Sequence, residues 1–164
     1  MRKYTLLLLI ALLLSGCTGE ETFETIADEW AAPVMAQPRE VTVHLPDNAV
    51  APVLENDGQQ VYLSDAYEIM IETLSAGDVD ASIQALTGYN REQLCVMETC
   101  RENVTRYEFV WTCTGEEGQR LGRGVILDDG NYHYCMSVLR DAQDSTSAQI
   151  VWNDVFSSFR LLPA

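Results

Sequence analysis

Lysine is almost absent from this chain. Lys3 is the single lysine among 164 residues, and ten basic residues stand against 25 acidic ones for a net charge of −15. A protein that binds nucleic acid needs a clustered basic surface, because contacts to the phosphate backbone supply much of its affinity. The composition therefore argues against a nucleic-acid partner. It is typical of an acidic domain that stays soluble and off anionic lipid headgroups.

Histidine is also scarce, which limits the catalytic chemistry. His44 and His133 are the only two. Each lies in a strand pattern, where a histidine on the polar face is the expected arrangement. No sharp strand-to-helix turn presents a serine nucleophile to either of them. We therefore predict no catalytic residues.

Metal-binding patterns are missing as well. The four cysteines after Cys17 are separated by 4, 12 and 21 residues, which is not the paired close spacing of a zinc site. No Cys-x-x-Cys motif marks a redox enzyme. Asp128 and Asp129 lack the further spaced acids of a calcium loop, so a polar turn is the better interpretation. We predict no metal site and no cofactor.

Long apolar runs are lacking too, and this bears on how the chain meets a membrane. The run from Leu6 to Leu14 has nine residues, whereas a membrane-spanning helix needs about 20. It follows the basic residues Arg2 and Lys3 and precedes small residues and a cysteine. This order of segments predicts a cleaved secretion signal.

The residues Leu14, Ser15, Gly16 and Cys17 resemble the lipobox of bacterial lipoproteins. The resemblance implies cleavage between Gly16 and Cys17 and a diacylglycerol on the Cys17 thiol, and two acyl chains anchor a protein stably. An ordinary secretory signal is the alternative. We expect a lipid anchor in the cell membrane with the domain on the extracytoplasmic side. Thr18 gives no aspartate retention signal, so inner membrane, outer membrane and Gram-positive surface stay open.

Cleavage changes both the length and the charge. Loss of 16 residues leaves 148, which suits one domain, and loss of Arg2 and Lys3 leaves eight arginines against 25 acids, a net charge of −17. We predict a signal peptide at 1–16, a lipidated N-terminus and tether at 17–38, and a single domain at 39–164. Apolar residues from Phe23 to Trp30 have helical spacing. Residues 18–38 are predicted to be a flexible tether about 25 Å long, the alternative being that the striped segment is a short helix docked on the domain or the bilayer surface.

The first half of the domain mixes strand and helix signals. Alternation over 40–45, 60–63 and 67–72 predicts strands, with a loop at Asp57 and Gly58. Asp78 as N-cap and Gly88 as a stop frame a short helix. A further turn at 90–94 and a strand at 95–99 follow.

The second half predicts a sheet closed by a helix. Alternating segments between Tyr107 and Val138 are separated by turn residues at 115–118 and 128–131, which indicates an antiparallel meander. Asp144 is the expected cap of a final helix, whose apolar stripe runs from Ala148 to Phe159 and should pack across the sheet.

With its meander followed by the closing helix, the domain resembles a group of uncharacterised bacterial lipoproteins. The segments 106–111, 127–134 and 152–159 carry the resemblance. Over Val41 to Leu161 the chain is more distantly similar to the PsbP, DcrB and Ran-binding Mog fold. The resemblance implies an α+β fold, with a curved antiparallel sheet of about six or seven strands flanked by two main helices in a PsbP/Mog-like sandwich. It also implies an accessory or binding role.

The remaining cysteines are Cys95, Cys100, Cys113 and Cys135. Export permits disulfides, and four cysteines allow three complete pairings. The outer strands of a three-stranded meander would hold Cys113 and Cys135 about 9 to 10 Å apart, beyond the roughly 7 Å limit for a bridge. In one strand, Cys95 and Cys100 would be about 16 Å apart. We expect most or all four to be unbridged.

These patterns favour a non-catalytic binding or accessory lipoprotein that holds an unknown protein or small-molecule partner. One alternative is an extracytoplasmic hydrolase that uses carboxylates, although no pair of acids can be selected from 25. The other is a thiol redox protein that uses Cys95 and Cys100.

Overall fold

The computed structural model describes residues 36–115, 118–141 and 146–163. Residues 36–164 form one compact unit. Predictions made for Cys17, for the stripe from Phe23 to Trp30 and for the Asp144 cap lie outside the described residues. Within the described ranges, none of the helices has the length and apolar character needed to cross a membrane.

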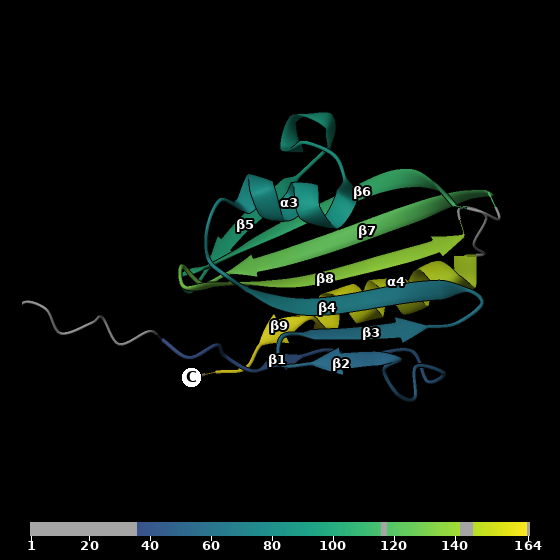
Figure 1. Cartoon of the computed structure of the whole chain (residues 1–164), viewed down its shortest axis with the longest axis horizontal. Coiled ribbons are helices and arrows are strands. Elements are labelled where there is room, and N and C mark those ends of the chain that lie inside the picture. Colours follow the sequence, from purple (N-terminus) through teal and green to yellow (C-terminus); the bar gives the residue numbers. More distant parts are fainter. Residues whose placement is uncertain (1–35, 116–117, 142–145, 164) are drawn as a thin grey trace, which may run out of the picture. The chain divides into compact units, whose positions relative to one another are not determined.

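Nine strands and two α-helices make up the described part of the chain (Figure 1). The strands are β1 Val41–Thr42, β2 Leu54–Asn56, β3 Gln59–Leu63, β4 Tyr67–Ser75, β5 Met97–Arg101, β6 Val104–Gly115, β7 Gly118–Asp128, β8 Tyr132–Asp141 and β9 Arg160–Leu161. The helices are α3 Val79–Thr87 and α4 Thr146–Ser158, with a 3₁₀ turn, η1, at Arg91–Gln93. The predicted α+β class is confirmed.

Seven strands form one antiparallel sheet in the order β2-β3-β4-β8-β7-β6-β5. The predicted meander β6-β7-β8 is confirmed, and it holds the three longest strands of the sheet. β1 and β9 pair separately, with Val41 opposite Leu161. After β4 the chain continues at β5, the opposite edge of the sheet, and returns through β6 and β7 to β8, which pairs with β4. Segments far apart in sequence therefore share the two faces of the sheet.

Helix α3 has the predicted ends. The Asp78 side chain accepts a hydrogen bond from the Asp80 N–H over 3.0 Å. Gly88 follows the helix with φ at +78°, a left-handed conformation that glycine adopts without steric cost. Local sequence therefore determines both ends of this helix.

Three strand predictions need correction. The strand expected over 40–45 is only Val41–Thr42, because its partner β9 has two residues and the alternating side chains pack on the core without further pairing. Leu54–Asn56, just before the predicted loop at Asp57 and Gly58, is a strand that was not predicted, since this exposed edge carries no alternation. The strand expected at 95–99 lies at Met97–Arg101, because the turn at Glu102 and Asn103 pairs Arg101 with Val104.

The sheet buries a core on each face (Figure 1). On one face, α4 contributes Trp152, Val155 and Phe156, which pack on residues of β4, β7 and β8. On the other, Ile83 of α3 packs on aromatic residues of β6. This confirms the expected packing of the final helix across the sheet.

Two glycines of β7 allow aromatic rings of β6 to lie flat across the sheet. Gly124 is opposite Phe109 and Gly122 is opposite Trp111. A Cβ added at either glycine would overlap the facing ring. The absence of a side chain at these two positions is therefore a packing requirement of the α3 face.

All four domain cysteines are free thiols in the structure. Cys113 on β6 and Cys135 on β8 are separated by the intervening strand β7. Cys135 is fully buried, and burial raises the pKa of its thiol to about 12, with the nearby Glu72 carboxylate adding to the shift. A thiol with so high a pKa carries almost no reactive thiolate at neutral pH.

Candidate anion-binding pocket

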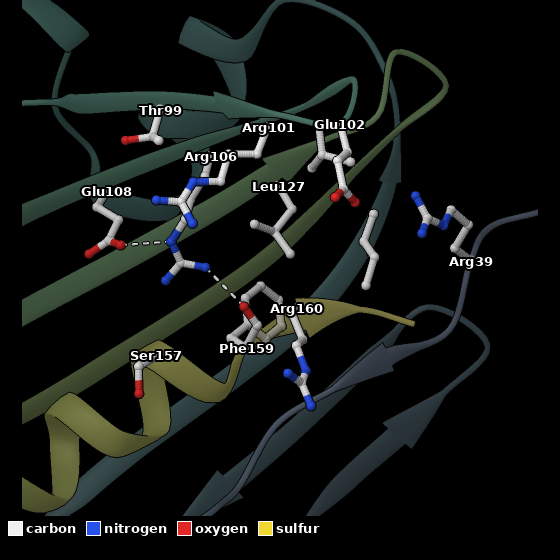
Figure 2. A pocket seen from close by; sticks show the side chains of 12 residues that line it. Arg39, Thr99, Arg101, Glu102, Arg106, Glu108, Leu127, Ser157, Phe159 and Arg160 are labelled. Carbon is white, nitrogen blue, oxygen red and sulfur yellow. Dashed lines mark hydrogen bonds and ion pairs between the residues drawn. The ribbon is translucent and has the colours of Figure 1, made fainter. Parts of the chain in front are cut away.

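A pocket of about 490 Å³ opens beside the end of the sheet formed by β5 and β6 (Figure 2). One wall comes from β5, β6 and β7, and the other from the end of α4, from β9 and from Arg39. Its lining residues are Arg39, Thr99, Arg101, Glu102, Val104, Arg106, Glu108, Leu127, Ser157, Phe159, Arg160 and Leu161. Its volume lies in the range of small-molecule sites.

The lining of this pocket is cationic, in contrast to the chain as a whole. It contains four arginines and two glutamates, which leaves a net charge of +2 in a chain of net charge −15. The mature chain expected after cleavage has eight arginines, so half of its cations gather here. Concentrated positive charge in a concave site attracts anions, because the low-dielectric walls focus the field.

Arg106 lines the pocket, and each of its three guanidinium nitrogens donates a hydrogen bond. It donates to the carbonyl oxygens of Phe156 over 2.7 Å and of Phe159 over 2.9 Å. These carbonyls lie in and just beyond the last turn of α4, where an arginine satisfies otherwise unpaired acceptors. Its Nε donates to Glu108 over 2.6 Å. Arg106 therefore holds α4 against β6.

Glu108 is fixed between two arginines. Its second oxygen accepts from Arg123 over 3.0 Å, and the Arg123 guanidinium lies 4.3 Å from the centre of the Phe156 ring. Burial of the Glu108 carboxyl opposes ionisation, but the hydrogen bonds from Arg106 and Arg123 outweigh it and lower its pKa below the usual 4.5. Glu108 is therefore an ionised structural acceptor.

Arg39 links the pocket to the start of the domain. Its main-chain N–H donates to the Tyr134 hydroxyl over 2.8 Å, and its Nη2 donates to the Leu162 carbonyl over 2.6 Å. The Tyr134 hydroxyl in turn donates to Asp129 over 3.0 Å. The Arg39 Nε is buried and has no hydrogen-bond partner in the described residues. A buried donor of this kind needs an acceptor.

Arg101 and Arg160 complete the cationic lining. Both are exposed, and across the described ranges neither side chain has a hydrogen-bond or ion-pair partner. Arg101 ends β5, immediately before a tight turn in which Glu102 and Asn103 both have positive φ, at 50° and 63°. Two residues with positive φ are typical of the hairpin turns that match the twist of a sheet. This turn places Glu102 at the pocket rim.

His133 takes part in a second polar cluster, on the opposite face of the sheet. Its Nδ1 lies 2.9 Å from Ser82 Oγ, and its Nε2 lies 3.8 Å from Asp128 Oδ2. Serine, histidine and aspartate in this order suggest a nucleophile triad, but His133 is 1% exposed and Ser82 is 9% exposed. Neither can meet a substrate from solvent.

The position of His133 corrects one sequence expectation. We expected both histidines on the polar face of a strand. His44 is exposed, but it lies beyond the end of β1 and outside any strand. His133 is buried because β8 is a central strand with both faces covered. Within the described ranges, no group of three or more histidine, cysteine or acidic residues is arranged to hold a metal ion.

Comparison with known proteins bears on the N-terminus. A family model for the prokaryotic membrane lipoprotein lipid attachment site matches residues 1–18. The chain carries a lipoprotein attachment site. The match spans Gly16 and Cys17, the positions predicted for cleavage and lipid attachment, and supports anchoring of this lipoprotein to a membrane through lipid. A search of curated proteins finds no match.

Sequence reasoning did not find the arginine pocket of this lipoprotein. Arg39, Arg101, Arg106 and Arg160 form no motif, and Arg106 entered only as part of a resemblance. The one available signal was the composition of the mature chain. Its 148 residues include only eight arginines, so each of them could have been considered as a candidate anion-binding residue. Their convergence depends on pairing between β5 and β6 and on the return of the C-terminus to β1.

Proposed function

We propose that this protein is an extracytoplasmic, membrane-anchored lipoprotein that acts as a non-catalytic binding module and holds a small anionic ligand in the arginine pocket. The lipid attachment site supports the anchor. The observation that carries the binding role is the pair Arg101 and Arg160, two guanidinium groups that line one pocket and have no hydrogen-bond or ion-pair partner among the residues that the structure describes. Guanidinium forks bind carboxylate and phosphate groups with paired hydrogen bonds.

The chemistry of the pocket favours binding over hydrolysis. Hydrolysis by a pair of carboxyls requires a proton donor with a raised pKa. The pKa of Glu108 is lowered and its two oxygens are occupied by arginines. Glu102 is an exposed residue of the rim. The carboxylate pair that the hydrolase alternative requires is therefore weakly supported.

The thiol redox alternative has less support. None of the pocket-lining residues is a cysteine. Cys95 and Cys100 are exposed free thiols near the outer strand β5. Cys135, the most buried of the four, has a pKa of about 12.

The fold implied by resemblance fits the same role. We infer a PsbP/DcrB/Mog-like sandwich, in which an accessory domain presents a ligand site without catalytic groups. The element order supports this inference: strands, helix α3, the meander and a closing helix α4, with one helix on each face of the sheet. Analogy at the level of fold is weaker support than the pocket itself.

Calorimetric titration of the mature chain carrying Cys17→Ser, which removes the lipid, tests the function. Citrate and inorganic phosphate serve as probes. We expect binding that weakens with salt, and at least a tenfold loss in the double variant Arg101→Gln/Arg160→Gln, because a hydrogen bond to a charged group contributes about 1.5 to 3 kcal/mol.

Arg91→Gln is the matched control. Arg91 pairs with Asp80 and Glu98 away from the pocket, and its loss should leave binding unchanged. Binding that is equal in all variants, or absent for every anion, contradicts the proposal.

A further inference from the structure

The charge of the lining indicates the charge of its ligand. Four arginines and two glutamates give +2, and Glu108 is already neutralised by Arg106 and Arg123. Arg39, Arg101, Arg160 and Glu102 remain, again with a net charge of +2. A ligand with two negative charges balances this site, whereas a monoanion leaves positive charge uncompensated.

The free cations belong to two different walls. Arg101 is on β5, at the edge of the seven-stranded sheet, and Arg160 is on β9, in the separate pair with β1. Figure 2 shows Arg101 beside Arg106 on the sheet side, with Arg160 and Arg39 on the side of β9 and β1. Arg39 lies on the second wall, and its buried Nε has no acceptor among the described residues. The donors thus form two groups.

Apolar residues also line this pocket: Val104, Leu127, Phe159 and Leu161. Figure 2 shows Leu127 and Phe159 between Arg101 and Arg160. Leu127 and Phe159 belong to the buried core, and the other two pack against it as half-buried residues. An apolar strip between two cationic ends fits a ligand with a hydrocarbon spacer between two anionic groups.

Resting on the proposed function, we propose that the pocket binds a soluble dicarboxylate, with one carboxylate on Arg101 and the other on Arg160 and Arg39. The aliphatic spacer lies along Leu127 and Phe159. A lipid headgroup is the other source of anionic charge. A phosphodiester carries a single charge, and a domain of this acidity is repelled by an anionic leaflet.

Octanedioate and octanoate are the matched probes, since they share an eight-carbon chain and differ by one carboxylate. Calorimetry on the mature chain carrying Cys17→Ser should give at least tenfold tighter binding of octanedioate. Arg101→Gln and Arg160→Gln should each reduce the preference to less than threefold. Both side chains are exposed and, in the part of the chain that the structure describes, make no hydrogen bond or ion pair. Thermal melting at the wild-type temperature would verify that both variants fold.

The outcomes separate this inference from the proposed function. Equal affinity for the two probes, with both dependent on the arginines, overturns the dicarboxylate and leaves an anion-binding module. If octanedioate, octanoate, citrate and phosphate all fail to bind, both the dicarboxylate site and the anion-binding function are wrong. Arg101-dependent binding to phosphatidylglycerol vesicles that is tighter than binding to octanedioate overturns the inference in favour of a lipid headgroup.

Discussion

The main-chain N–H of Arg39 donates to the hydroxyl of Tyr134 over 2.8 Å, although 95 positions separate the two residues. Tyr132, next but one to Tyr134 along β8, donates to the Ala36 carbonyl over 2.7 Å. The segment that enters the domain is thus tied to the central strand of the sheet. The Arg39 guanidinium also lines the pocket. Arg39 therefore belongs both to the segment that begins the domain and to the candidate ligand site.

Tyr134→Phe should lower the free energy of unfolding by about 1 to 3 kcal/mol. The substitution leaves the Arg39 N–H without an acceptor and removes a donor from Asp129, and an unsatisfied buried polar group costs about that much. Urea denaturation followed by fluorescence measures the change. Tyr132→Phe is the control, because its hydrogen bond is exposed and its loss should cost less. If both variants lose the same free energy of unfolding, the hydrogen bond from Arg39 to Tyr134 stabilises the fold no more than the exposed one made by Tyr132.

Acid should remove the stability that Glu108 provides. Its pKa is lower in the folded state than the usual 4.5, so its contribution is complete above about pH 4.5 and is lost as pH falls through the folded pKa. Glu108→Gln should therefore have a lower free energy of unfolding than the wild type at pH 7. The difference between the two proteins should become smaller below pH 4. Urea titrations at both pH values measure it. A gap that stays constant or widens in acid would refute the assignment.

Gly124→Ala should destabilise the fold by about 1 to 3 kcal/mol, the usual cost of overpacking a core. The added methyl group would overlap the Phe109 ring on β6. Gly77→Ala is a suitable control, since open space surrounds that position, and it should change stability by less than about 1 kcal/mol. Thermal melting compares the two. If Gly124→Ala melts at the same temperature as the wild type, the Phe109 ring does not lie over this glycine.

The parts of the fold that follow local rules could be predicted from sequence. Asp78 and Gly88 fix the ends of α3 through a side-chain cap and a left-handed residue, and both signals lie within the helix or next to it. Alternation also predicted the meander. Pairing partners were harder to predict, because the lengths of β1 and β2 depend on which strand lies beside them.

The pocket could not be predicted, for a physical reason. Arg39 and Arg160 are 121 positions apart in the sequence. They line the same pocket because the C-terminal strand β9 returns to pair with β1. His133 was misjudged for a related reason, since the alternation of β8 does not separate solvent from core when helices cover both faces. In both cases tertiary packing determines the environment.

Binding of an anion between Arg101 and Arg160 can be followed directly through the side-chain Nε–H signals of arginine in ¹⁵N NMR spectra. Titration with octanedioate should shift the signals of Arg39, Arg101 and Arg160 in a saturable manner. Arg91, which is paired outside the pocket, should not move. Uniform small shifts of all arginine signals, or no shift of the Arg101 and Arg160 signals, would show that the anion does not bind between these two residues.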